Sequence, residues 1–80
     1  MKIGVHQQQL SAKRIKKGFS QRKLAKQINR AVSYISQLES GKRNPSPESA
    51  KEICDVLETE FEELFYIQNV LKSERNMKFA

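Results

Sequence analysis

The sequence predicts an all-α fold, a compact domain of five helices that contains a helix-turn-helix. Apolar residues recur at intervals of three and four, and capping and turn residues separate the apolar segments. No strand-like alternation is long enough to predict a sheet. The 80 residues suit one small domain, which would bury only about 60% of its unfolded surface. We therefore assign residues 1–80 to a single domain, with a core of about 8–66 and a C-terminal extension of 67–80.

The first third of the chain predicts two helices. The first spans Gln7–Lys17 and is followed by Gly18 as a C-cap, whereas residues 1–6 form only a tail or a short extended arm. Ser20 opens the second helix, because its hydroxyl can accept a hydrogen bond from an orphan backbone N–H. Asn29 ends this helix, since asparagine tolerates the left-handed backbone of a sharp turn.

The third helix is expected to begin near Ala31 or Val32. On a helical wheel of about 100° per residue, Ile35 and Leu38 point inward. The outward side chains are short, uncharged and able to form hydrogen bonds, as the reading of base edges in a DNA major groove requires. These residues are Ser33, Ser36, Gln37 and Ser40. We interpret residues 20–41 as a DNA-reading helix-turn-helix.

The fourth helix follows a turn over residues 41–45 and has a strong start signal. Ser46 is a good N-cap, Pro47 suits the first helical position, and the Glu48 carboxylate favours the positive end of the helix dipole. The helix is expected to run to about Leu57. Its inward stripe consists of Ala50, Ile53, Cys54 and Leu57.

A fifth helix is expected to start near Thr59 or Glu60, with an apolar pattern that persists through residues 70–71. Its core residues are Phe61, Leu64 and Phe65. Three further apolar residues extend the stripe beyond what the core can cover, which makes them candidates for a dimer contact. They are Ile67, Val70 and Leu71. The acidic residues Glu58, Glu60, Glu62 and Glu63 are interpreted as the solvated face of this helix.

The net charge of +6 is unevenly distributed. Residues 1–47 hold eleven Lys or Arg and the single acid Glu39, whereas residues 48–80 hold four basic and eight acidic residues, so the halves carry +10 and −4. A basic half indicates a side that faces phosphates; alternatively, the cations only keep the helices soluble. One cysteine excludes an intramolecular disulfide and favours a reducing, cytoplasmic setting. No run of 18 apolar residues suggests a membrane segment.

Three groups of residues resemble the Cro and phage-repressor type of helix-turn-helix regulator, an XRE-like and lambda-repressor-like family. These are Ser20-Gln21 with Leu24-Ala25, then Ile35-Ser36 with Leu38-Glu39, Gly41 and Pro45-Ser46, and finally Phe61 with Leu64-Phe65. The resemblance covers about residues 8–66 and implies a domain that binds operator DNA as a dimer and represses transcription. Asn29, Arg30 and Ala31 replace a usual glycine, an apolar residue and a capping residue. We expect the Arg30 stem to lie across the core while its head reaches solvent or phosphate.

The resemblance assigns DNA contacts to two sets of residues. Those that approach bases or flanking phosphates are Val32, Ser33, Tyr34, Ser36 and Gln37. Those that contact phosphates are Gln21, Arg30, Lys42, Arg43 and Asn44. Gln37 can bind adenine in bidentate fashion, whereas the loop residues position the protein rather than specify a sequence. For both sets the alternative is an ordinary solvated helix face. The resemblance also pairs Arg14 with Glu39 in a partly buried ion pair.

Nothing in the sequence favours enzymatic chemistry, a cofactor or a small-molecule ligand. There is no paired carboxylate in an apolar setting, no glycine-rich phosphate loop and no nucleophile with a histidine partner. His6 has no second ligand spaced for a metal, and Cys54 fits the core. The leading hypothesis is a repressor that binds double-stranded DNA as a homodimer. The alternative is a protein-interaction module, such as an antitoxin or coactivator-like adaptor, that presents the acidic half to a partner.

Overall fold

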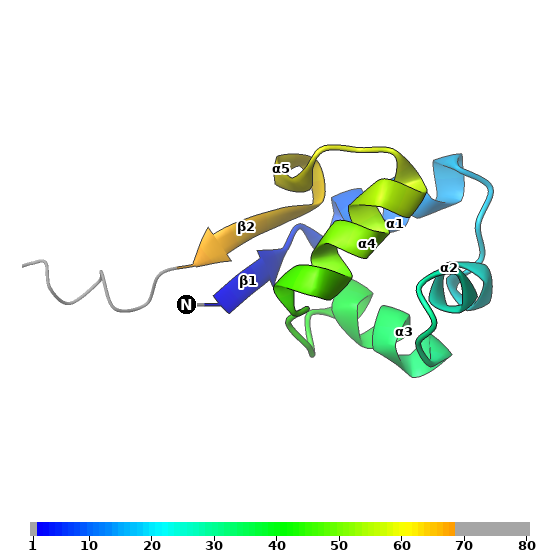
Figure 1. Cartoon of the computed structure of the whole chain (residues 1–80), viewed down its shortest axis with the longest axis horizontal. Helices are drawn as coiled ribbons and strands as arrows, with labels where there is room; N and C mark the ends of the chain where they lie inside the picture. Colours follow the sequence, from blue (N-terminus) through cyan, green and yellow to red (C-terminus); the bar gives the residue numbers. More distant parts are fainter. Residues whose placement is uncertain (1, 69–80) are drawn as a thin grey trace, which may run out of the picture.

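Five helices and a small two-stranded sheet make up the protein (Figure 1), for which a computed structural model describes residues 2–68. In chain order these elements are β1 (Lys2–Val5), α1 (Gln7–Lys16), α2 (Gln21–Gln27), α3 (Val32–Ser40), α4 (Pro47–Leu57), α5 (Phe61–Leu64) and β2 (Phe65–Gln68). The predicted fold class is confirmed in its main features. The sheet is an addition that the sequence did not predict.

The helix boundaries follow the capping residues. The hydroxyls of Ser20 and Ser46 accept hydrogen bonds from the backbone N–H three residues on, at 3.0 and 3.1 Å. Asn29 has the left-handed conformation expected of it, with φ of 59°, and Gly41 ends α3 with φ of 81°. Ala31 supplies no side-chain cap to α3. The predicted starts of α2, α3 and α4 are therefore confirmed.

The fifth helix is much shorter than predicted. α5 ends at Leu64, and the chain continues as the strand β2. Aromatic and β-branched residues at the start of β2 fit a pleated strand better than a helix; these are Phe65, Tyr66 and Ile67. The predicted continuation of the helix is therefore wrong at residues 65–68. Val70 and Leu71 lie outside the described residues.

β2 pairs antiparallel with β1, in a register that sets Ile3 opposite Ile67 and Gly4 opposite Tyr66. Gly4 allows the tyrosine ring to lie across β1, because a Cβ at this position would fall 2.1 Å from Cζ of Tyr66. The sequence shows no alternation long enough to predict this sheet, and the structure adds it. The two strands of this sheet lie at opposite ends of the described residues, so local periodicity does not reveal their pairing. Of the two descriptions given for the start of the chain, the extended arm is the correct one for Lys2–Val5.

One hydrophobic core joins the helices to the sheet. The fully buried apolar side chains come from every helix and from β2, and the largest of them are Leu10, Leu24, Ile35, Leu38, Ile53, Leu57, Leu64 and Phe65. Ile3 of β1 is 4% exposed and belongs to the same core. Cys54 is buried as expected, and its burial together with the charge of Asp55 raises the pKa of the thiol to about 11. No helix within residues 2–68 has the length and apolar character needed to cross a membrane.

Candidate nucleic-acid interface

α2 and α3 form a helix-turn-helix whose turn is closed by backbone contacts. The left-handed Asn29 reverses the chain, and the Arg30 N–H donates to the carbonyl of Ala25 at 2.9 Å. Ile35 and Leu38 of α3 are fully buried, as predicted. Because these two side chains fix one face of α3 against the core, the opposite face is presented to solvent.

The five predicted base-contact residues of α3 differ in their exposure to solvent. Ser33 and Ser36 are exposed, whereas Gln37 is half-buried. Val32 and Tyr34 are also half-buried, and both pack against the core. The outward side of α3 is therefore a narrow polar strip. Val32 and Tyr34 flank this strip and contribute to packing.

An arginine–tyrosine cluster, formed by Arg30, Tyr34, Gln37 and Arg43, lies at one side of this strip. The guanidinium carbons of Arg30 and Arg43 lie 5.0 and 5.4 Å from the centre of the Tyr34 ring, distances typical of cation–π contacts. Arg43 Nε donates to Gln37 Oε1 at 2.7 Å. Arg30 is exposed, so the expectation that its stem lies across the core is wrong. The turn directs this side chain over Tyr34 instead.

Besides Arg43, two more of the predicted phosphate-contact residues use their side chains within the protein. The Nε2 atom of Gln21 donates to Glu39 Oε1 at 3.0 Å, and the Nδ2 atom of Asn44 donates to the carbonyl oxygen of Ile3 at 2.7 Å. The Asn44 contact ties the loop after α3 to β1, an element that the sequence did not predict. Three exposed cations remain beside α3, and they are Arg30, Lys42 and Arg43.

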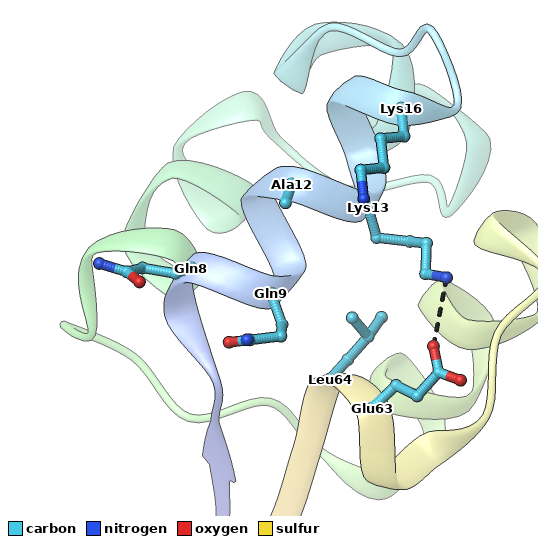
Figure 2. Close-up of a pocket in the computed structure, with 7 residues that line it drawn as sticks. All are labelled: Gln8, Gln9, Ala12, Lys13, Lys16, Glu63 and Leu64. Atoms are coloured by element: carbon cyan, nitrogen blue, oxygen red, sulfur yellow. Dashed lines mark ion pairs between the residues drawn. The ribbon is translucent and has the colours of Figure 1, made fainter.

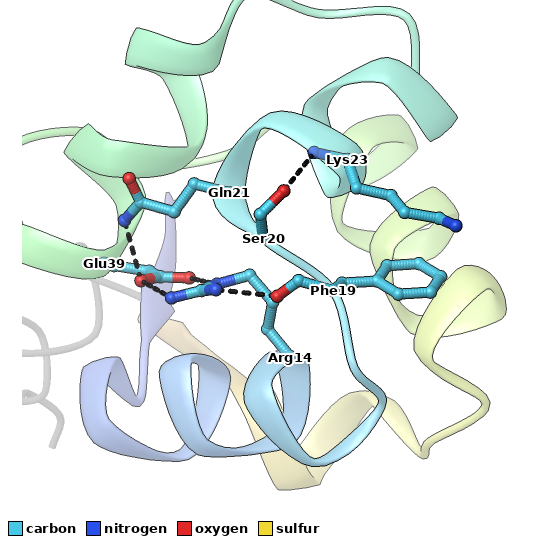
Figure 3. A network of polar contacts seen from close by, with 6 residues as sticks. All are labelled: Arg14, Phe19, Ser20, Gln21, Lys23 and Glu39. Atoms are coloured by element: carbon cyan, nitrogen blue, oxygen red, sulfur yellow. Dashed lines mark hydrogen bonds and ion pairs between the residues drawn. The ribbon is translucent and has the colours of Figure 1, made fainter.

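Arg14 and Glu39 lie together under the helix-turn-helix, as Figure 3 shows. Arg14 Nε donates to Glu39 Oε2 at 2.6 Å and Arg14 Nη2 to Oε1 at 3.1 Å, a two-point contact between side chains that are 11% and 9% exposed. Arg14 Nη1 also donates to the carbonyl oxygen of Phe19 at 2.8 Å. With Gln21 on the same carboxylate, these contacts join α1, α2 and α3. They set the orientation in which α3 is presented.

The acidic residues near α5 lie away from α3, which Figure 1 shows at the opposite edge of the domain. Glu58 was predicted to lie on the face of the fifth helix. It ends α4 instead, with φ of 55°. Its carboxylate lies 2.6 Å from Lys17 Nζ, and Glu63 lies 3.2 Å from Lys13 Nζ. The hydrogen bond from Lys17 lowers the pKa of Glu58. Hydrogen bonds from Thr59 and then Lys13 lower the pKa of Glu63.

A surface depression of about 480 Å³ lies between α1 and α5. Its lining residues are Gln8, Gln9, Ala12, Lys13, Lys16, Glu63 and Leu64. Figure 2 shows the Lys13 side chain reaching across to Glu63 at one end. The described residues contain no group of three or more side chains that would suit a metal ion. The depression has no lining residue from α3, so it is separate from the candidate interface.

A helix-turn-helix family model matches residues 10–64, well over half of the chain. The protein therefore belongs to the XRE-type helix-turn-helix family. The match covers all five helices apart from the start of α1, but it leaves out both strands. No significant match was found among curated protein sequences.

Solved structures of two regulators resemble this protein. The restriction-modification controller protein C.AhdI from Aeromonas hydrophila is 33% identical, with a TM-score of 0.67 over 71% of this chain and 86% of its own. The clp gene regulator ClgR from Corynebacterium glutamicum is 28% identical, with a TM-score of 0.67 over 71% of this chain. This chain spans only 61% of the ClgR chain. A protein from Bacteroides fragilis, 20% identical with a TM-score of 0.68 over 80% of this chain and 98% of its own, shows the same fold.

Proposed function

We propose that this protein binds double-stranded DNA through α3, occupies operator sites as a homodimer and represses transcription. The observation that carries the proposal is the exposed polar strip of α3, bordered by the cations Arg30, Lys42 and Arg43. Hydrogen-bonding side chains are what base edges require, and flanking cations suit the phosphates on either side. The family and the regulators ClgR and C.AhdI support a DNA-binding transcription regulator. A double-stranded DNA partner also supports the predicted cytoplasmic location.

The dependence of binding on salt tests this proposal directly. If each subunit neutralises about four phosphates, a dimer neutralises about eight, and log affinity should fall with log salt at a slope near −7. Fluorescence anisotropy on a labelled random duplex at several salt concentrations measures this slope. A slope near zero would exclude the DNA-binding function. Lys42→Ala removes one contact from each subunit, so it should flatten the slope by about 2 while weakening all sequences alike.

The proposed dimer needs a surface away from α3, because both copies of α3 must reach DNA half-sites about 34 Å apart. Ile67 of β2 is 61% exposed, which supports it as a contact, and Val70 and Leu71 remain candidates from the sequence. Ile15 of α1 is equally exposed at 61% and provides a matched control. Ile67→Asp should sediment as a monomer and bind operator DNA less tightly, whereas Ile15→Asp should remain a dimer. An Ile67→Asp variant that remains a dimer, as Ile15→Asp should, would exclude Ile67 from the interface.

The alternative function, a module that presents its acidic half to a protein partner, has less support. Two of the acidic residues already form ion pairs: Glu63 with Lys13 of α1, and Glu58 with Lys17, the residue that follows α1. These contacts reduce the negative charge that a basic partner would meet. The salt experiment separates the two functions, since an adaptor would bind random duplex DNA weakly at every salt concentration.

A further inference from the structure

The amide of Gln37 is held in one orientation by Arg43. The contact joins Arg43 Nε to Gln37 Oε1 at 2.7 Å. A guanidinium group has donors and no acceptor, so the amide atom that faces it must be the oxygen. The remaining polar end of Gln37 is then its NH₂ group. Among residues 2–68, no hydrogen bond occupies Nε2 of Gln37 or the Nη atoms of Arg43.

Tyr34 keeps Arg43 beside Gln37. Tyr34 precedes Gln37 by three residues and therefore lies on the same side of α3. Its half-buried ring packs against the core and has the Arg43 guanidinium 5.4 Å from its centre. A ring fixed in this way restricts the arginine to the neighbourhood of the Gln37 amide. The pair consequently presents two kinds of hydrogen-bond donor, Gln37 Nε2 and Arg43 Nη, toward the solvent side of α3.

We propose that Gln37 and Arg43 act together to read guanine, an inference that rests on the proposed DNA-binding function. Guanine presents two acceptors in the major groove, N7 and O6, which match two donors. Adenine presents one acceptor and one amino donor, so its bidentate recognition needs Gln37 Oε1 as an acceptor. Arg43 already donates to this oxygen, so only its second lone pair is left for the amino group of adenine, directly beside the guanidinium. Its positive charge also repels the amino group of adenine.

This proposal changes the roles expected of three residues. Gln37 reads a base other than the adenine that its amide alone would favour. Arg43 becomes specificity-determining, where the sequence suggested only a phosphate contact. Tyr34 becomes a positioning residue that acts through Arg43. Tyr34→Phe should therefore preserve base preference because the aromatic face remains, whereas Tyr34→Leu should relax it at the guanine position alone.

The decisive comparison uses two variants that each lose one positive charge from the same loop. Arg43→Met removes the group that holds Gln37, and Lys42→Met is the matched control. Binding sites are selected from a random duplex library with the wild type and each variant. The wild type and Lys42→Met should select guanine at one position in each half-site. Arg43→Met should replace this guanine by adenine, with a change in relative affinity of roughly tenfold or more.

Two further measurements test the chemistry of the contact. Replacing the selected guanine by 7-deazaguanine removes one acceptor, so it should weaken wild-type binding by roughly tenfold and leave Arg43→Met nearly unaffected. In the protein without DNA, the Nε2 amide resonances of Gln37 should shift in Arg43→Met and stay in place in Lys42→Met. A shift in both variants, or in neither, would show that Arg43 does not hold the amide.

The outcomes separate this inference from the function beneath it. If the wild type binds no duplex in a salt-dependent way, the proposed function and the guanine inference both fail. If binding is salt-dependent and one sequence is enriched, the function stands. Selection with Gln37→Ala identifies the base position at which Gln37 determines preference. If the wild type selects adenine at that position, the guanine inference alone is overturned. It is equally overturned if Arg43→Met and Lys42→Met select the same sites.

Discussion

Two arginines make similar contacts in surroundings that differ sharply. Arg14 Nε donates to Glu39 at 2.6 Å, and Arg43 Nε donates to Gln37 at 2.7 Å. The first pair is buried, with side chains 11% and 9% exposed, and involves two opposite charges. In the second pair the arginine is exposed and its acceptor is a neutral amide. The same donor atom thus serves a junction between helices inside the domain and, at the surface, a contact that orients one side chain of α3.

The difference lies in how many other groups depend on each contact. Glu39 also accepts from Gln21, and Arg14 also donates to the carbonyl of Phe19, so breaking this junction leaves several partly buried groups without partners. No comparable set of buried groups depends on the Arg43–Gln37 contact, which is one hydrogen bond at the surface beside the Tyr34 ring. The buried junction therefore sets where α3 points, while the exposed pair remains available for a base.

Loss of the buried junction should have the largest effect. Glu39→Ala leaves the Arg14 charge buried without its partner, which costs about 3 to 5 kcal/mol. For so small a domain this approaches the whole free energy of unfolding. Urea and thermal denaturation followed by circular dichroism measure the loss. Glu39→Gln serves as a control that keeps an acceptor for Arg14, and it should lose less. A melting temperature that barely changes in Glu39→Ala would mean that the pair contributes little.

The exposed pair should affect binding instead of folding. Gln37→Ala should weaken binding to the preferred operator by about 1 to 3 kcal/mol and leave binding to random duplex almost unchanged. Stability should stay the same, since alanine is the better helix former. Ser33→Ala should act in the same direction more weakly. Site selection with the wild type and Gln37→Ala gives the comparison, and identical preferred sequences would move base reading to Val32, Tyr34 or Ser36.

The sequence predicted well the features whose signals are local. Ser20 and Ser46 were recognised as caps because a side chain and the N–H groups it satisfies lie within three residues of each other. The inward positions Ile35 and Leu38 follow from helical periodicity alone. The Arg14–Glu39 contact came from a resemblance, since no local rule pairs residues that are 25 positions apart.

The sequence predicted poorly the features that depend on distant partners. β1 and β2 pair although they are about 60 residues apart in the sequence, with Ile3 opposite Ile67, and each strand is only four residues long. The role of Asn44 cannot be inferred without β1, because its amide donates a hydrogen bond to the Ile3 carbonyl of that strand. The Gln37–Arg43 contact was missed for a related reason. A loop conformation brings the arginine back to α3, and loop conformation has no periodic signal.

Asn44 can show whether the loop after α3 serves the fold or the DNA contact. Its hydrogen bond to the Ile3 carbonyl, at 2.7 Å, is worth about 0.5 to 1.5 kcal/mol. Asn44→Ala should lower the free energy of unfolding by this amount and speed amide exchange in β1. The slope of log affinity against log salt should remain that of the wild type. A slope flattened by about 2, as expected for Lys42→Ala, would instead make Asn44 a phosphate contact.

The smallest effect should come from the ion pairs Lys17–Glu58 and Lys13–Glu63, which are partly or fully exposed to solvent. Hydrogen bonds lower the pKa of both glutamates in the folded protein. A lowered pKa stabilises the fold above the ordinary glutamate pKa of about 4.3, and this contribution is lost as pH falls through the lowered value. The double variant Glu58→Gln with Glu63→Gln should therefore have a slightly lower melting temperature than the wild type at pH 7, and this gap in melting temperature should close by about pH 3 or in 1 M salt.

The control is Glu62→Gln, which removes a charge that has no ion pair among residues 2–68. It should show no such gap. A gap that persists at low pH would mean that the glutamine substitutions act through packing rather than charge.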